Sequence, residues 1–266
     1  RTLVEQLGSF KDGEIHTVYE AGFSGFGLHR YMEERGIKNI VVNPASIPVA
    51  KKDRVKTDKR DARKLASELS HGSLRCIRIP STGEEVERLI TRARAKMVKK
   101  RTAVRNEIWM KLYQFGYIGA EQSLMSLKWI ESFIKREGIA EELKIVLECS
   151  IEQCRLFNKE ILLLNKQISK RAKESKEIEI LRSIPGIGEL SACVIANELG
   201  NMKQFSTDKK LYSFVGLTPS EESSGDSVRR GHITRQGRPE LRALLVQCAW
   251  VAIRDDNGLA TVFRRI

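Results

Sequence analysis

Short apolar runs alternate with amphipathic stretches over the first part of the chain. Residues 37–42 are apolar and β-branched and predict a buried parallel strand, and residues 26–35 before them have the spacing of a helix that Gly36 would close. Four further elements follow the same alternation: strands at residues 15–19 and 74–79, and helices at residues 2–7 and from residue 57 onward. This order predicts an α/β domain over residues 1–82, with helices packed on the faces of a sheet.

After residue 83 the apolar spacing becomes helical throughout. A long helix is predicted over residues 84–113, and its apolar face consists of Val86, Ile90, Ala93, Met97, Val104, Ile108 and Leu112. A second is predicted over residues 143–172, where from Cys154 onward the apolar positions alternate steps of three and four, as in a coiled-coil seam. We expect residues 83–178 to form a long helical hairpin that pairs with itself or with another copy.

The last section, residues 179–266, is predicted to be mainly helical and opens on a glycine pair. Gly186 and Gly188 stand between apolar anchors, directly before a helix predicted over residues 189–199. Two glycines let the backbone approach a phosphate, with N–H groups and a helix N-terminus pointing at it. The pattern is typical of a helix-hairpin-helix, which grips DNA without reading its sequence. The alternative is an ordinary tight turn.

The charge balance favours a polyanionic partner. The 266 residues carry a formal net charge of +13 with a pI of about 9.6, and Lys and Arg are spread through the predicted helices. Because the sequence has no long apolar run, nucleic acid is a better candidate partner than a membrane, and no signal peptide or transmembrane segment is visible. The five cysteines and four histidines show neither paired nor metal-ligand spacing, which indicates a reducing compartment and no zinc site.

One face of the helix predicted over residues 84–113 is strongly basic. Like charges at this density repel each other, so an anionic partner would stabilise them, and the alternative is a face that is merely solvated. The candidate nucleic-acid contacts are Arg92, Lys96, Lys99 and Lys100, in a set that also contains Arg94, Arg101 and Arg105.

An acidic pair opens the helix that begins near residue 57. Thr57 or Asp58 can cap this helix, and Asp58 and Asp61 lie three residues apart on one face, where both carboxylates could hold one cation. Glu20 follows the strand at residues 15–19, at the sheet edge where open α/β sheets bind ligands. The alternatives are a capped helix with solvated carboxylates, and a loop residue at position 20.

A serine-rich loop precedes a basic run near the end of the chain. The loop, residues 220–227, contains Ser223 and Ser224, and the arginines that follow are Arg229, Arg230 and Arg235. A final helix is predicted over residues 239–253, with Pro239 in its first turn. Serines flanked by arginines can bind a phosphate, or one of them can attack it. The alternatives to attack are phosphate contact alone and a surface turn.

Several short motifs follow one another in a definite order. They are Glu-Ala-Gly after a strand, Asn-Pro after the next, Lys-Thr-Asp-x-x-Asp-Ala, a helical insertion, Ile-Pro-Gly-Ile-Gly, Gly-Leu-Thr-Pro, and Ser-Gly followed by Thr-x-x-Gly-x-x-x-Leu-Arg. This order resembles that of the DEDD-type insertion-sequence transposases, the recombinases that work with a bridge RNA. The resemblance runs over nearly all 266 residues and is specific through order and spacing, not through any single motif.

The resemblance implies an RNase H-like (RuvC-like) N-terminal domain in which four acidic residues hold magnesium. Glu20, Asp58 and Asp61 match three of the four. The first, an Asp on the opening strand, has no counterpart, because Asp12 falls in a turn after the first predicted helix. The chain opens on Arg1 rather than Met, and we expect a fragment cut at both ends whose missing strand precedes Arg1.

The resemblance also implies a serine nucleophile, which here is Ser224, with Ser223 as the neighbouring alternative. Attack on a phosphodiester would leave a phosphoserine link to DNA, with Arg229, Arg230 and Arg235 as candidate phosphate clamps. Since the acidic residues and the serine lie in different predicted domains, the active site would be composite, and the coiled coil could build it within a dimer or tetramer. The implied partners are DNA and a structured bridge RNA, in a prokaryotic cytoplasm at the nucleoid.

Two rival functions come from different classes. A RuvC-like metal-dependent nuclease or resolvase would cut DNA with water, and Ser224 would then only contact phosphate. A non-enzymatic nucleic-acid-binding protein would use the basic helices and the hairpin alone, and its acidic residues would be relics.

Overall fold

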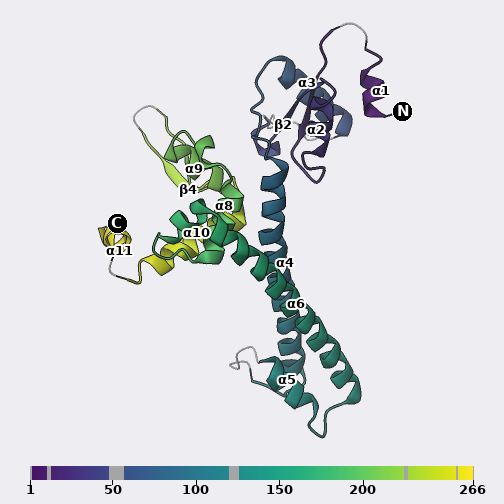
Figure 1. The fold of residues 1–266 in the computed structure, drawn as a ribbon, viewed down its shortest axis with the longest axis vertical. Helices are drawn as coiled ribbons and strands as arrows, with labels where there is room; N and C mark the ends of the chain where they lie inside the picture. The colour runs from purple at the N-terminus through teal and green to yellow at the C-terminus, as the bar shows by residue number, and fades with distance from the viewer. Residues whose placement is uncertain are drawn as a thin grey trace. The chain divides into compact units, whose positions relative to one another are not determined.

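The computed structural model describes residues 2–10, 13–47, 57–119, 126–224, 227–255 and 257–265. The chain divides into two compact units, Arg1–Ser81 and Thr82–Ile266, whose elements are labelled in Figure 1. In the described parts, the first unit holds a small parallel sheet, and the second is helical apart from one β-hairpin. None of the described helices combines the length and the apolar character that crossing a membrane requires.

A parallel strand pair forms the centre of the first unit. Strand β1 (His16–Glu20) pairs with β2 (Lys38–Val42) in a register that places Glu20 opposite Val42. Parallel neighbours need a crossover connection, and helix α2 (Gly27–Glu33) lies in it and packs on β2. Val41 and Val42 are buried, as the apolar run predicted.

Buried polar groups fix this crossover helix on the sheet. Asn39 of β2 is 5% exposed, and its Nδ2 donates to Thr17 Oγ1 of β1 at 2.8 Å. Its Oδ1 lies 2.9 Å from His29 Nδ1 of α2, and its backbone N–H donates to Glu33 Oε1 at 2.8 Å. Because buried polar groups cost free energy unless they are hydrogen-bonded, this set specifies one position of the helix.

Two more helices and a short 3-10 turn complete the first unit. Helix α1 (Leu3–Leu7) is capped by Thr2 and Glu5 in a capping box. The 3-10 helix η1 (Pro44–Ser46) follows β2, and α3 (Asp58–Ser70) packs against β1.

The strand predicted over residues 74–79 is wrong. This segment forms a single bridge, between Cys76 and Val42, and one further hydrogen bond from Ile77 N to Val41 O at 2.8 Å. Arg75, Cys76 and Arg78 are exposed, so the apolar residues between them bury too little surface to extend the ladder.

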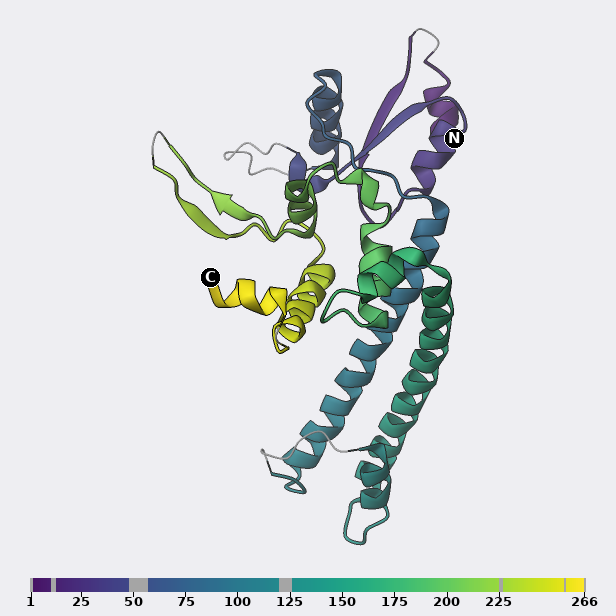
Figure 2. The same cartoon turned by 60° about the vertical axis from the view of Figure 1, so that its left-hand side comes forward.

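Two long antiparallel helices are the main elements of the second unit. Helices α4 (Thr82–Gln114) and α6 (Glu141–Glu174) run side by side, and α5 (Leu127–Ile134) packs at one end (Figure 2). Their shared core contains residues of both predicted apolar faces, among them Val104, Ile108, Leu112, Leu147 and Cys154. The prediction of two long helices packed on each other is therefore confirmed, while supercoiling of their seam stays a prediction.

Polar pairs across these two helices set their register. Arg94 Nε donates to Asn165 Oδ1 at 2.7 Å, and Arg101 Nη1 donates to Asn158 Oδ1 at 2.9 Å. Residue numbers rise along α4 as they fall along α6, which is the pairing of antiparallel helices.

Shorter helices complete the second unit. They are α7 (Lys176–Arg182), α8 (Glu189–Leu199), the 3-10 turn η2 (Met202–Gln204), α9 (Asp208–Val215), α10 (Pro239–Ala252) and α11 (Gly258–Arg265). Ile195, Leu199, Val215 and Leu241 form a core shared by α8, α9 and α10. The predicted helices at residues 189–199 and 239–253 are confirmed, and Pro239 stands in the first turn of α10 as expected.

Residues 220–224 and 227, within the predicted loop, belong to a β-hairpin. Strands β3 (Pro219–Glu221) and β4 (Arg230–Ile233) are antiparallel, and backbone bonds continue the pairing from Thr218 and Thr234 to Ser224 and Ser227. All residues of both strands are exposed, so the alternation of apolar and polar positions that predicts a half-buried strand is absent.

Candidate functional site

The acidic candidates lie at element ends in the first unit. Thr57 caps α3, its side chain accepting a hydrogen bond from Arg60 N at 3.4 Å, as the sequence predicted. Asp58 and Asp61 therefore occupy the first turn, where the helix dipole favours negative charge. Glu20 is the exposed last residue of β1, the strand on which α3 packs.

These carboxylates do not complete a metal site. Among the described residues, no group of three His, Cys, Asp or Glu side chains is placed to hold a metal ion. Two of the three lie on one turn of α3, and the third is on the adjacent strand. Glu20, Asp58 and Asp61 therefore do not form a closed ligand cluster in this structure, and their role as metal ligands stays a prediction.

Ser224 lies at the distal end of the β-hairpin. Its N–H donates to Ser227 O at 3.1 Å, and Ser227 N donates back to Ser224 O at 3.2 Å, on either side of residues 225 and 226, which are outside the described residues. The Ser224 side chain is exposed, and in the described part of the chain its hydroxyl makes no hydrogen bond. Ser223 differs, because its Oγ donates to Glu221 Oε1 at 2.8 Å.

The three arginine candidates lie at different heights of this hairpin. Glu222 N donates to Arg229 O at 2.9 Å, which places Arg229 only two residues below the Ser224–Ser227 pair. Arg230 faces Glu221, with 3.9 Å between Arg230 Nε and Glu221 Oε2. Arg235 follows Thr234 at the base, eight residues from Ser227 or about 26 Å at the usual rise of a strand. Arg229, not Arg235, is thus the arginine nearest to Ser224 along the hairpin.

The base of the hairpin is locked onto the end of α9 by two glycines. A Cβ on Gly216 would lie 2.9 Å from Gln236 O, and one on Gly237 would lie 2.5 Å from Phe214 O. Arg242 Nη1 of α10 donates to Val215 O at 3.0 Å in the same place. These residues belong to the Gly-Leu-Thr-Pro and Thr-x-x-Gly-x-x-x-Leu-Arg motifs, so both motifs hold the chain segments that carry the hairpin.

The glycine pair of the predicted helix-hairpin-helix has two different environments. Gly186 has a φ of +84°, and a Cβ there would lie 2.3 Å from Cys248 O and 2.8 Å from Ala252 N of α10. Its close approach is therefore made to α10. No atom lies within 4 Å of the corresponding position on Gly188. The sequence-based reason for Gly186 is replaced by packing, and Gly188 stays a candidate for nucleic-acid contact.

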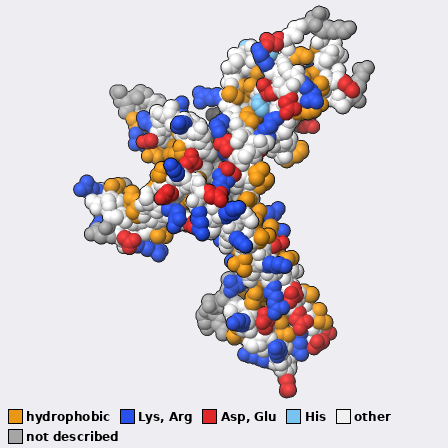
Figure 3. Space-filling view, viewed as in Figure 1, with side chains coloured by type: hydrophobic (Ala, Val, Ile, Leu, Met, Phe, Trp, Pro, Cys, Tyr) orange, Lys and Arg blue, Asp and Glu red, His pale blue; other side chains and the backbone are white. Residues whose placement is uncertain are grey.

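The basic face predicted on α4 is largely engaged within the protein. Arg94 and Arg101 are hydrogen-bonded to α6, and Arg92 binds Glu198 of α8 through both carboxylate oxygens, at 2.7 and 2.8 Å. Lys100 Nζ lies 5.8 Å from the centroid of the Phe157 ring. Figure 3 shows Lys and Arg side chains along the hairpin, with carboxylates gathered toward its α5 end. These arginines are therefore paired within the protein and not merely solvated, because antiparallel packing brings polar groups of α6 and α8 to them.

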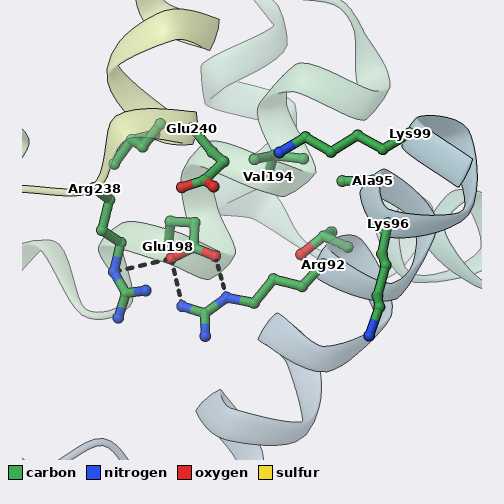
Figure 4. Close-up of a pocket in the computed structure, with 10 residues that line it drawn as sticks. Arg92, Ala95, Lys96, Lys99, Val194, Glu198, Arg238 and Glu240 are labelled. Carbon is green, nitrogen blue, oxygen red and sulfur yellow. Dashed lines mark hydrogen bonds and ion pairs between the residues drawn. The ribbon is translucent and has the colours of Figure 1, made fainter. Parts of the chain in front are cut away.

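Glu198 is a functional candidate that the sequence did not reveal. Its side chain is 9% exposed and lies between Arg92 and Arg238, whose Nε is 3.1 Å from Glu198 Oε2 (Figure 4). Burial by itself would raise the pKa of Glu198, yet the hydrogen bond from Arg92 and the charges of Arg238, Arg92 and Arg88 together lower that pKa below its ordinary value. The available signal was a Glu beside Asn197 inside an otherwise apolar helix.

The backbone around Glu198 is joined to α4 as well. Arg88 Nε donates to Asn197 O at 2.8 Å, and Asn197 Nδ2 donates to Glu87 O at 2.9 Å. Arg88 and Asn197 are both buried. The end of α8 is thus held on α4 by charged and polar groups rather than by apolar contact alone.

Two family models match different parts of the chain. Residues 178–263 match the model of the transposase IS116/IS110/IS902 family, and residues 1–116 match the DEDD transposase model of IS110-type elements. The second match implies an RNase H-like fold and points to dependence on a divalent metal.

Individual relatives match along most of the chain. The protein y4qE of Sinorhizobium fredii is 28% identical over 250 residues, which cover 94% of this chain and 61% of that protein. The transposase for insertion sequence element IS1111A of Coxiella burnetii is 27% identical over 254 residues, covering 94% of this chain and 69% of that protein. The chain thus spans about two thirds of the length of these relatives. With the two models matching its beginning and its end, the chain is similar to the IS110-type insertion-sequence transposases along most of its length.

Proposed function

We propose that this chain carries out the DNA cutting and rejoining of an insertion-sequence transposase through Ser224. The observation that supports this most is the hairpin tip, where the Ser224 hydroxyl is exposed and the Ser223 hydroxyl is held by Glu221. An attacking hydroxyl must be free to approach phosphorus. This difference favours Ser224 over Ser223 as the nucleophile.

The proposed reaction is an exchange of phosphodiesters. Ser224 Oγ forms a bond to phosphorus as it loses its proton to solvent, and a DNA oxygen leaves with the electrons of the broken P–O bond and takes up a proton. The product is a phosphoserine ester, which a DNA hydroxyl can attack to restore a phosphodiester without ATP. Arg229, two residues from the tip pair, is proposed to neutralise the charge that develops on the phosphate.

Magnesium is proposed as the divalent ion, with Glu20, Asp58 and Asp61 as ligands supplied by this chain. Oxygen ligands suit Mg²⁺, and two of these carboxylates share the first turn of α3. The proposal is tested by replacing Asp58 and Asp61 with Asn and measuring Mg²⁺ binding by calorimetry alongside DNA joining. Unchanged Mg²⁺ binding would remove these residues from the metal site.

The remaining exposed cations are proposed to hold nucleic acid. Lys96 and Lys99 make no ion pair or hydrogen bond within the described chain, and Gly188 leaves open space before the N-terminus of α8. Lys100 belongs to the same set. The net charge of +13 is larger than one cleavage site requires, which supports a second polyanion, and we propose a bridge RNA that pairs with the DNA.

A dimer or tetramer is proposed as the working form. Leu156 and Leu163 lie one heptad apart on α6 and are 54% and 62% exposed, although they belong to a helix whose other side is packed on α4. Exposed leucines at this spacing are typical of a helix that packs on a further helix.

The central experiment compares the two serines. Ser224→Ala should abolish both DNA joining and the covalent protein–DNA adduct, which is detected as labelled DNA that stays with the protein in denaturing electrophoresis. Ser223→Ala is the matched control and should retain both. A Ser224→Ala protein that still cuts would support the RuvC-like nuclease, and a wild-type protein that binds DNA without adduct or cleavage would support a non-enzymatic binding protein.

A further inference from the structure

A cavity of about 400 Å³ lies between α4, α8 and α10 in the second unit. Its lining residues come from all three helices: Thr91, Arg92, Ala95, Lys96, Lys99, Val194, Glu198, Arg238, Glu240 and Leu241. Figure 4 shows Arg92, Glu198 and Arg238 meeting at one side, while Lys99 extends across the cavity toward Val194. The site is distinct from the β-hairpin that carries Ser224.

The lining combines an apolar floor with a basic rim. Ala95, Val194 and Leu241 supply apolar surface, and Lys96 and Lys99 supply two ammonium groups that have no partner in the described part of the chain. An ammonium that crosses an apolar surface without a carboxylate beside it favours an anionic ligand.

Glu198 positions the guanidinium groups of this rim. Its buried carboxylate holds Arg92 through two hydrogen bonds and Arg238 through an ion pair at 3.1 Å. Glu198 thus neutralises part of the charge of the two arginines and fixes where they stand. With Lys96 and Lys99 added, the rim has more cations than carboxylates even when Glu240 is counted.

We propose that this cavity binds one unpaired nucleotide of a single-stranded nucleic acid, with its base over Ala95, Val194 and Leu241 and the two phosphates that flank it at Lys96 and Lys99. A cavity of about 400 Å³ lies within the usual range of roughly 300–1,000 Å³ for sites that enclose a small organic group. Stacking or apolar contact with a base, together with a backbone-tracking cation, is how single strands are held. The proposal rests on the proposed nucleic-acid function and deepens it.

The test measures binding of the wild-type chain to fluorescein-labelled oligothymidylate and oligouridylate, by anisotropy over a range of salt concentrations. The Lys96→Ala/Lys99→Ala variant should bind about tenfold more weakly and reduce the salt slope by about 1.4, the value for two phosphate contacts on a single strand. Ala95→Leu, which fills the cavity without changing charge, should weaken binding at least threefold, roughly, and leave the salt slope unchanged. Tighter binding of one oligonucleotide identifies the strand as DNA or RNA.

The matched control removes two lysines elsewhere. Lys159 and Lys166 are exposed on α6 and have no partner in the described part of the chain, so Lys159→Ala/Lys166→Ala changes the net charge equally. Equal weakening by both double variants, with no effect of Ala95→Leu, would overturn the proposal in favour of general charge. Displacement of the oligonucleotide by a polyglutamate peptide at equal charge concentration would also overturn it, in favour of an acidic protein partner.

The outcome is separable from that of the proposed reaction. Ser224 lies outside the cavity, so Ser224→Ala tests the proposed reaction while the cavity variants test oligonucleotide binding. If Ser224→Ala retains DNA joining, the proposed reaction fails while the cavity result stands. If the cavity variants bind normally while Ser224→Ala loses the adduct, only the cavity proposal fails. Thermal unfolding of each variant confirms that it is folded.

Discussion

Two glycines in one short motif show how identical residues can serve different physical ends. Gly186 combines a φ of +84° with a backbone approach that leaves no room for a Cβ, whereas Gly188 has a φ of −81° and open space. Both were predicted from sequence to approach a phosphate. A sequence motif indicates that a side chain is excluded, but not which neighbour excludes it.

This contrast gives a prediction at the residue scale. Gly186→Ala should destabilise the fold by about 3 kcal/mol, because the methyl group meets α10 and the residue is held in the left-handed region. Gly188→Ala should change the free energy of unfolding by less than about 0.5 kcal/mol. Urea unfolding measures both. Equal destabilisation by the two variants would contradict the packing role of Gly186.

Some residues of the candidate site could be foreseen, and others could not. Thr57, Asp58 and Asp61 were placed correctly because helix capping is local and acts within one turn. Glu198 was missed because its partner Arg92 lies 106 positions away, and only the packed fold brings the two together. A partner this distant leaves no spacing signature in the sequence.

At the scale of elements, the predicted helices and strands agree with the structure where interactions within the segment itself determine its conformation. The strand predicted at residues 15–19 is β1, and the helix predicted at residues 84–113 is α4, each displaced by only one or two residues. The spacing of apolar residues, a local signal, predicted both. The β-hairpin was missed because its strands are exposed on both faces. The segment at residues 74–79 was predicted as a strand from its apolar residues, but apolar residues alone do not guarantee pairing with a neighbouring strand.

The junction of α4, α8 and α10 should depend on pH through Glu198. Because its pKa in the folded protein is lowered, its contribution to stability is present above the unfolded pKa, about 4.3, and is lost as pH falls through the folded pKa. Glu198→Gln should therefore cost about 2 kcal/mol at pH 7 and progressively less below about pH 4. Urea unfolding at several pH values tests this.

The control for that experiment lies in the same cavity. Glu240 is exposed at the first turn of α10, so Glu240→Gln should leave the free energy of unfolding nearly unchanged at every pH measured. A cost for Glu198→Gln that does not diminish in acid would show that the side chain acts through shape and not through its charge.

For the whole molecule, motif order predicted more than folding physics could. The order of acidic, helical, glycine and serine motifs pointed to the family whose models match the two ends of the chain. The spacing of apolar residues predicted the helices, but it gives no information on the distance between the two units. The first unit carries Glu20, Asp58 and Asp61, and the second carries Ser224. The composite active site is therefore a matter for complementation in solution.

Mixing two inactive proteins tests whether that site is shared between subunits. One carries Ser224→Ala, and the other carries Asp58→Asn and Asp61→Asn. If a site combines the carboxylates of one subunit with the serine of another, a mixed oligomer contains one site with every group intact, and DNA joining should return to about a quarter of the wild-type level by random assortment. If each subunit builds its own site, every site in the mixture lacks a group and joining stays absent. If joining returns, adducts should be found only on the chain that retains Ser224, which distinguishes complementation from a trace of wild-type protein.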